Sequence, residues 1–152
     1  MNATVPTPRP TPPTSELSRP YWEAAQQGRL VLQCCAACGL TRHYPRLLCS
    51  RCHSDQCVWK PASGRGTVHS WTVSHHAFHP SFIPELPYTL VTVDLEEGVR
   101  ALGRWQEGPT PAIGQAVLGA FRVREGGVDL VFSLQHHLLL APHPAAQFPA
   151  QQ

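Results

Sequence analysis

The chain has 152 residues, with 12 basic and 10 acidic side chains and a formal net charge of +2. Charged residues make up 14% of it, below the quarter typical of soluble domains, and 42% are hydrophobic, which excludes a wholly disordered chain. The eleven arginines are scattered, so they do not form the basic patch of a general nucleic-acid-binding protein. No apolar run approaches the ~18 residues of a membrane span and the N-terminus lacks a signal-peptide pattern. We therefore expect a cytoplasmic protein whose six cysteines are reduced or bound to metal.

A short helix is the first predicted element. The helix follows residues 1–14, where five prolines predict a solvated tail. A second solvated tail is predicted at the other end of the sequence, over residues 142–152. Within residues 15–29, Ser18 can cap a helix that a proline opens and Gly28 ends. A helix of two or three turns is not stable alone, so we expect it to pack on the rest of the fold.

Two CxxC pairs dominate residues 30–60. Cys35 and Cys38 form the first pair, and Cys49 and Cys52 form the second, with ten residues between the pairs. Four thiolates suit tetrahedral Zn²⁺ at about 2.3 Å and leave no open position for water, so we predict a closed, structural zinc site. Iron accepts the same ligands and would make this half of the chain an electron carrier. Two cysteines remain: Cys34 adjoins a ligand and is expected to point away from the metal, and Cys57 could replace Cys52 as a ligand but lacks a CxxC partner.

The segment 61–141 is predicted to consist of strands separated by turns. Alternating apolar residues predict five strands, over residues 67–75, 88–95, 99–105, 117–124 and 128–134. Tight turns are expected at 96–98 and 125–127, with the paired carboxylates of Glu96 and Glu97 in solvent. Five strands with a break after the third are typical of an OB fold, a small barrel without exposed edges. A small sandwich has the same periodicity and is the alternative.

Several motifs in a fixed order indicate a family. They are Tyr21-Trp22, Gly28-Arg29-Leu30, the two cysteine knuckles, Tyr44-Pro45-Arg46, Ser63-Gly64-Arg65-Gly66-Thr67-Val68, Pro87-Tyr88 and the run from Val93 to Val99. Over about residues 15–140 the chain resembles the family catalogued as domain of unknown function 35, a rubredoxin-like zinc ribbon followed by an acyl-CoA-associated OB fold. The resemblance implies a mainly β protein with a short N-terminal helix, the ribbon and a five-stranded antiparallel barrel. His53 stands where this family often has glycine, so it must adopt a conformation that costs about 1 kcal/mol.

The resemblance also implies a function. It implies a non-catalytic accessory subunit of a thiolase-superfamily enzyme (a thiolase, acyltransferase or aldolase) that helps to bind acyl-CoA. The sequence contains no nucleophile elbow, phosphate loop or zincin helix of its own. Two alternatives are a single-stranded nucleic-acid-binding module, which the low charge disfavours, and a rubredoxin-like iron electron carrier.

Further candidate residues lie outside the cysteine knuckles. Arginines paired along two strands could hold the phosphates of acyl-CoA, although a solvated barrel face is the alternative: Arg100, Arg104, Arg122 and Arg124. Apolar residues of the helix and of the loop 76–87 are candidates for partner contact: Tyr21, Trp22, Phe78, Phe82 and Ile83. Three histidines within 75–79 could bind a metal, but a polar loop is the preferred interpretation because no carboxylate lies near them in the sequence.

Overall fold

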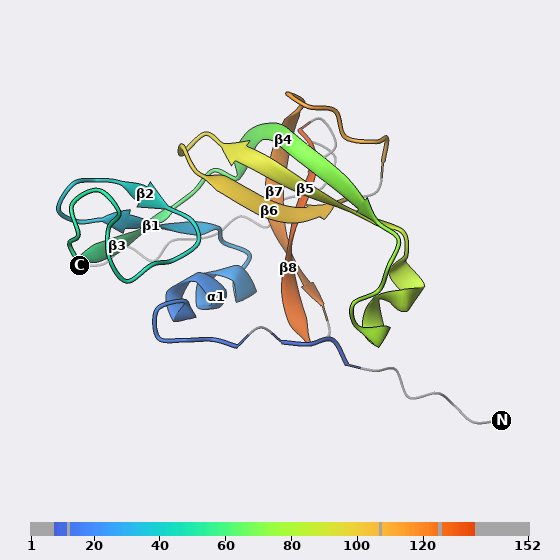
Figure 1. Cartoon of the computed structure of the whole chain (residues 1–152), viewed down its shortest axis with the longest axis horizontal. Helices are drawn as coiled ribbons and strands as arrows, with labels where there is room; N and C mark the ends of the chain where they lie inside the picture. Colours follow the sequence, from blue (N-terminus) through green and yellow to red (C-terminus); the bar gives the residue numbers. More distant parts are fainter. Residues whose placement is uncertain (1–7, 12, 107, 125, 136–152) are drawn as a thin grey trace, which may run out of the picture.

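The computed structural model describes residues 8–11, 13–106, 108–124 and 126–135. They form a small three-stranded sheet and a closed barrel, with a short helix packed between them (Figure 1). The helix and the small sheet come first in the chain: α1 (Arg19–Gln26), β1 (Val31–Cys35), β2 (Thr41–Arg42) and β3 (Cys57–Pro61). The barrel follows: β4 (Arg65–Ser74), the 3₁₀ helix η1 (Pro80–Glu85), β5 (Tyr88–Leu95), β6 (Arg100–Trp105), β7 (Ala116–Arg124) and β8 (Gly127–Leu134). No helix in these ranges is long and apolar enough to cross a membrane.

The barrel has the strand order β4-β5-β6-β8-β7, and β7 pairs back onto β4. All five predicted strands are present within two residues of their expected bounds, and the fold class is confirmed. One detail differs, because β6 and β8 run parallel rather than antiparallel. The reason is geometric: a closed ring with an odd number of strands must contain at least one parallel pair.

The barrel interior is filled by side chains from alternate positions of its strands. Val91, Val93 and Val117 are fully buried, and the ring of Phe132 is 0% exposed. Space for this ring comes from two glycines on neighbouring strands. A Cβ atom at Gly103 would lie 2.8 Å from the Phe132 ring, and one at Gly119 would lie 2.6 Å from it. The centre of the barrel is therefore a packed core rather than a binding cavity.

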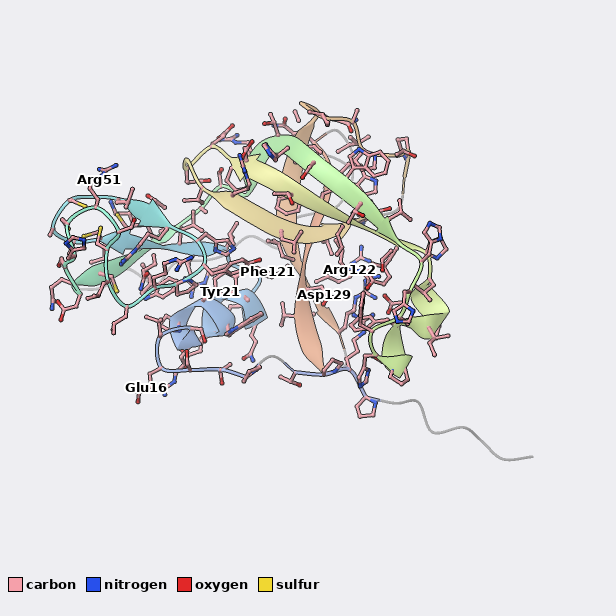
Figure 2. The ribbon with its side chains drawn as sticks, viewed as in Figure 1. Glu16, Tyr21, Arg51, Phe121, Arg122 and Asp129 are labelled. Atoms are coloured by element: carbon pink, nitrogen blue, oxygen red, sulfur yellow. The ribbon has the colours of Figure 1, made fainter. Side chains whose placement is uncertain are left out.

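The small sheet and the barrel share one core through α1. Strand β1 pairs antiparallel with both β2 and β3, and every residue of β1 is buried. The ring of Tyr21 on α1 lies beside that of Phe121 of β7 (Figure 2), with 5.8 Å between the ring centroids. Its centroid is 5.5 Å from that of His43 in the small-sheet unit. The helix is thus stabilised by packing on both units, as its length requires. Gly28 ends the helix region with φ 72°, a left-handed conformation that suits glycine.

Ser18 occupies the N-cap position of α1, but its side chain does not cap the helix. The hydroxyl instead accepts a hydrogen bond from the backbone N–H of Ser15 at 3.1 Å and lies 3.2 Å from that residue's hydroxyl. The difference arises because Ser18 has a helical backbone conformation, with φ −96° and ψ −10°, and a capping side chain needs an extended one.

Three segments predicted to be irregular or solvated make specific contacts. Residues 80–85 form η1 instead of an open loop. Glu97 accepts a hydrogen bond from the backbone N–H of Ser63 at 2.6 Å and its other oxygen is buried, so it is not in solvent, because the β5–β6 turn packs on the link between the two units. The tail prediction for residues 1–14 is wrong at Arg9, which is 14% exposed in its side chain and paired with acidic residues. The predicted tail at 142–152 lies outside the described residues.

Candidate functional site

The two CxxC segments form a matched pair of tight turns. In the first, the N–H of Cys35 donates to the carbonyl of Leu40 and the N–H of Gly39 donates to the carbonyl of Cys35, both at 2.9 Å. In the second, Cys49 and His53 make the equivalent bonds at the same distances. The residue that closes each turn has a left-handed backbone, with φ 73° at Gly39 and φ 58° at His53. This confirms the expectation that His53 adopts a conformation favoured by glycine.

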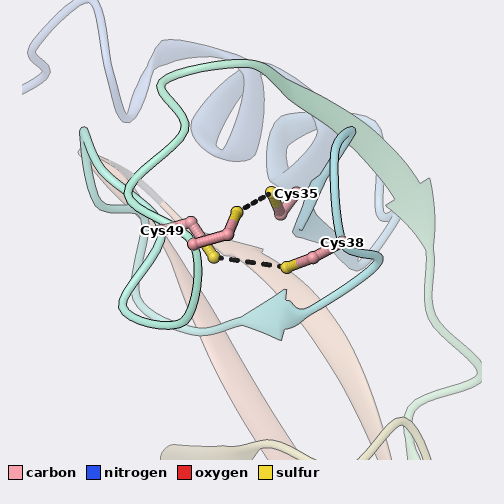
Figure 3. A group of neighbouring side chains, drawn as sticks. Cys35, Cys38 and Cys49 are labelled. Atoms are coloured by element: carbon pink, nitrogen blue, oxygen red, sulfur yellow. Dashed lines mark hydrogen bonds between the residues drawn. The ribbon is translucent and has the colours of Figure 1, made fainter.

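These turns bring four sulfurs to one point (Figure 3). The Sγ atoms of Cys35, Cys38, Cys49 and Cys52 all lie within 4.8 Å of one another. The Cys35–Cys52 and Cys38–Cys49 sulfur pairs are each 3.5 Å apart. Four sulfurs at 2.3 Å from a tetrahedral zinc ion would be about 3.8 Å apart, so the cluster fits Zn²⁺. The four predicted ligands thus lie together as one group, and the group suits a structural zinc site.

The backbone prepares these thiols to bind a cation. The N–H of Cys38 hydrogen-bonds the Cys35 sulfur and lowers the pKa of that thiol. The N–H of Cys52 does the same for Cys49 and lowers its pKa to about 6. Cys52 behaves in the opposite way: the N–H of Ser54 lowers its pKa, but the three neighbouring sulfurs and burial together raise it to about 12. A divalent cation removes this repulsion between converging thiolates and so stabilises the fully deprotonated set.

The two other cysteines are outside the cluster. The thiol of Cys34 donates to the carbonyl of Gly39 at 3.3 Å, on the opposite face of β1 from Cys35. Cys57 lies across from Cys35 in the β1–β3 ladder, and its sulfur accepts a hydrogen bond from the Gln33 side chain at 3.4 Å. Their polar contacts support the small sheet rather than the metal.

The structure brings together three of the four arginines predicted to hold phosphate. Arg104, Arg122 and Arg124 line a cleft of about 570 Å³ on the outer face of β6, β8 and β7, where the segment 84–89 forms one wall. Arg100 lies elsewhere, although it is on the same strand and face as Arg104. Its side chain donates to Asp94 at 2.6 Å, and this contact lowers the pKa of the Asp94 carboxyl, which His69 also contacts.

Two acidic residues that pair with these arginines were not singled out from the sequence: Glu85, which lines the cleft, and Asp129 on β8. Glu85 pairs with Arg104, and Asp129 lies 3.3 Å from Nε of Arg124. The guanidinium of Arg104 also covers the ring of Tyr88, with 4.6 Å between the Cζ atom and the ring centroid. The pair of Glu85 and Arg104 joins a loop to β6 and could not be read from a local pattern. Arg124 and Asp129 flank the turn predicted at 125–127, so that hairpin could have indicated their pairing.

The apolar candidates for partner contact separate into buried and exposed residues. Tyr21 is 5% exposed, so the prediction of a partner contact there is wrong: its ring is already covered by Phe121 and His43. Trp22 is half-buried against the core, and Phe82 is partly covered by Arg9. Phe78 and Ile83 are exposed at 85% and 60%.

The loop between the knuckles presents a second exposed apolar group, which the sequence analysis did not identify. Its members are Tyr44, Leu47 and Leu48, each more than half exposed. Their position on a short loop held between two metal ligands could have indicated such a group, because a loop of this kind cannot fold back over its own side chains. The histidines of 75–79 make local contacts: His79 accepts from the N–H of Ser81, and His76 lies edge-on to Phe78.

Known proteins show the same two units in the same order. Residues 22–57 match the rubredoxin-like zinc ribbon domain of ChsH2, and residues 59–122 match the C-terminal OB-fold domain of ChsH2. A chain in the solved structure of the Ltp2-ChsH2(DUF35) aldolase is 34% identical, with a TM-score of 0.74, over 81% of this chain and 98% of that chain.

Two further relatives are similar to this chain, one in fold alone and one over part of its sequence. A DUF35-family protein of unknown function from Sulfolobus solfataricus has a TM-score of 0.57 at 12% identity, over 80% of this chain and 87% of that chain, which shows the shared fold alone. A Thermomonospora curvata protein named "Probable enoyl-CoA hydratase alpha subunit" is 44% identical over 92 residues, which are 60% of this chain and 28% of that protein. This chain thus spans little more than a quarter of that relative. Because both of its units match in order, the chain belongs to the ChsH2 family of zinc-ribbon and OB-fold proteins.

Proposed function

We propose that this chain is a non-catalytic accessory subunit that associates with a thiolase-superfamily enzyme acting on acyl-CoA. The observation that carries the proposal is the match at 34% identity to nearly the whole length of a chain in the Ltp2-ChsH2(DUF35) aldolase. The match spans 98% of that chain, so it includes both the zinc ribbon and the barrel rather than one of them alone.

The chemistry of the chain supports a role without catalysis. Four thiolates saturate a zinc ion, so the metal has no position left to activate water or to polarise a carbonyl. The barrel interior is filled by Phe132 and its neighbours, so ligands meet the barrel from outside. The zinc ribbon then acts as a rigid platform, because metal binding supplies the folding free energy that so small a unit lacks.

The exposed apolar groups are the surfaces proposed to contact the enzyme. Tyr44, Leu47 and Leu48 lie on the loop between the zinc-binding turns. Phe78 lies just before η1 and Ile83 lies within it, at the opposite end of the molecule (Figure 1). Rigid apolar side chains bind with a low entropic penalty, which makes them effective anchors of an interface. The name enoyl-CoA hydratase belongs to a protein of which this chain resembles a 92-residue part, and it does not carry hydratase activity to this chain.

Co-expression with a thiolase-superfamily enzyme from the same genome tests the proposal. We expect a stable complex on size exclusion, with acyl-CoA turnover by the enzyme that increases when the chain is present and no turnover by the chain alone. Leu47→Asp should weaken the complex by tenfold or more, since a carboxylate replaces an apolar contact. Ile113→Asp is the matched control, because Ile113 is also exposed (76%) but lies outside both apolar groups.

Three results would count against an accessory subunit, and each has a different signature. A folded, zinc-loaded chain that binds none of the thiolase-superfamily enzymes of its genome contradicts the proposal. Retention on single-stranded DNA that weakens steeply with salt would favour the nucleic-acid alternative instead. A red protein that bleaches on reduction would favour the iron carrier.

A further inference from the structure

One arginine of the zinc ribbon is buried without a hydrogen-bond partner. Arg42 is the last residue of β2 and is 6% exposed. Its Nε atom and both terminal guanidinium nitrogens are buried, and none of the three donates a hydrogen bond to a described residue. Arginine stays protonated in proteins, so a full positive charge lies inside this small unit. Because an isolated charge is costly to remove from water, the fold requires a compensating negative charge close to it.

The polar groups nearest to Arg42 in the sheet and in the sequence do not supply this charge. Gln33 stands directly opposite Arg42 in the β1–β2 ladder, but its side-chain oxygen accepts a hydrogen bond from the backbone N–H of Arg46 at 2.9 Å. Asp55 is the only acidic residue in the sequence from position 30 to position 60, and its side chain is exposed. None of the ion pairs between described residues includes Arg42.

The zinc-binding sulfurs are the remaining source of negative charge near Arg42. Side chains two residues apart on a strand point to the same face, so Gln33 and Cys35 of β1 share one face of the small sheet. Arg42, opposite Gln33, lies on that face too and is the diagonal neighbour of Cys35. Diagonal neighbours are about 7–8 Å apart, a distance that a long side chain can span. Four thiolates and one Zn²⁺ have a net charge of −2, so the zinc-loaded site would supply what the guanidinium needs.

We propose that Arg42 stabilises the metal-bound form of the four-cysteine site, as a buried cation that offsets part of its double negative charge. The attraction between two charges increases as water is excluded around them, so a buried guanidinium acts more strongly than an exposed one at a similar distance. This role concerns the chain's own residues and holds whether or not the chain associates with an enzyme.

Arg51 provides a comparison within the same unit. It lies between the ligands Cys49 and Cys52 in the sequence, which makes it closer to the metal along the chain than Arg42 is. Its side chain is exposed, however, and it lies at the outer edge of the ribbon in Figure 2. Water and salt screen a charge in that position, so we expect Arg51 to contribute little to the metal site.

Competition with a chromophoric chelator tests the proposal by measuring the zinc affinity of the full-length chain. Arg42→Met keeps a long apolar stem and removes the charge, so we expect it to weaken zinc binding by about tenfold or more, because the negative site loses the cation buried beside it. Arg42→Lys keeps the charge and should weaken zinc binding by less than about threefold. Arg51→Met is the matched control, and its zinc affinity should stay within about twofold of the wild-type value.

A second measurement separates charge from folding, since zinc binding and folding of the ribbon are coupled. The four thiolates also accept iron, and one-electron reduction from ferric to ferrous iron at an electrode changes the net charge of the site from −1 to −2 in the folded chain. A buried cation favours the more negative state. Arg42→Met should therefore shift the reduction potential of the iron-loaded chain to a more negative value, whereas Arg51→Met should leave it near that of the wild type.

Two results would overturn the proposal. Zinc affinity within about twofold of the wild-type value in Arg42→Met would show that something other than the sulfurs, such as an enclosed water molecule, satisfies the guanidinium. Weaker zinc binding with an unchanged iron potential would assign Arg42 to packing alone. If Arg42→Met binds no metal, Arg42→Lys decides: zinc affinity close to the wild-type value supports the role of the charge, and an equal loss of binding contradicts it.

Discussion

The Phe132 ring at the centre of the barrel leads to a specific prediction about stability. In Gly119→Ala the new Cβ would lie 2.6 Å from the ring, whereas carbon atoms in contact are normally about 3.5–4.0 Å apart. The ring or the strand must therefore shift by about 1 Å in a closed barrel with no free space around it. Overpacking of this kind destabilises by about 1–3 kcal/mol, and the lower backbone entropy of alanine offsets about 0.5–1 kcal/mol of that. We expect Gly119→Ala to reduce the free energy of unfolding by about 1–2 kcal/mol.

Urea denaturation at a fixed zinc concentration measures this change. With an m-value of about 2 kcal/mol per M, the midpoint should fall by about 0.5–1 M. Phe132→Leu alone should also destabilise, because it leaves a partial cavity, but in the double variant the smaller side chain makes room for the methyl group. The double variant should therefore be more stable than the sum of the single effects by about 1 kcal/mol. Gly127→Ala is the matched control, since its Cβ would contact nothing within 4 Å.

Additive single effects would refute this reasoning, because they would show that Gly119 and Phe132 do not compete for the same space. A Gly127→Ala variant as unstable as Gly119→Ala would refute it as well, since backbone entropy rather than crowding would then explain both. The outcome matters for the cleft, because Gly119 lies on β7 with Arg122 and Arg124, and Phe132 lies on β8 with Val131, which also lines the cleft.

Three further predictions concern the zinc ribbon. Cys38→Ser should lower the zinc content, measured by elemental mass spectrometry, from one ion per chain toward none. It should also unfold the ribbon, because the metal supplies folding free energy on the order of 10 kcal/mol. A fully zinc-loaded variant would contradict the ligand assignment. Burial lowers the pKa of His43 from 6.5 to about 4. Between pH 6.5 and pH 4 the unfolded state therefore binds more protons than the folded state, so the free energy of unfolding should fall as the pH drops. The expected loss is about 2 kcal/mol, because the ring is partly exposed to solvent. His43→Gln should remove this part of the pH dependence, and equal slopes in variant and wild type would exclude His43 as its source. His53→Gly should raise the free energy of unfolding by about 0.5–1 kcal/mol in urea, because φ 58° suits glycine, whereas His53→Ala should bring no gain.

The metal centre could be predicted from the sequence because its geometry is local. A CxxC turn places two sulfurs on one side of the backbone within four residues, and the same turn closed by Gly39 and His53 is found in both knuckles. The strands were predictable for a similar reason, since period-two alternation reports which face of each strand is buried. Neither prediction depends on contacts between distant parts of the chain.

Which of the arginines reach the cleft could not be predicted from local patterns. Arg100 and Arg104 are equivalent by period and by face, yet Asp94 holds one of them, and the other reaches the cleft because β6 pairs with β8. Arg9 and Asp129 are 120 residues apart in the chain and lie within 2.9 Å of each other.

The amino-acid sequence by itself thus determined the zinc ligands, the left-handed turn positions and the five strands, because these depend on backbone geometry over a few residues. The tertiary structure alone decided that Tyr21 is buried between the two units, that three arginines share one cleft, and that Arg9 pairs with Glu85 and Asp129 beside them. The physical reason is closure of the barrel: it joins β6 to β8 and brings η1 and residue 9 against the same outer face, and contacts over such separations follow from the packing of the whole core.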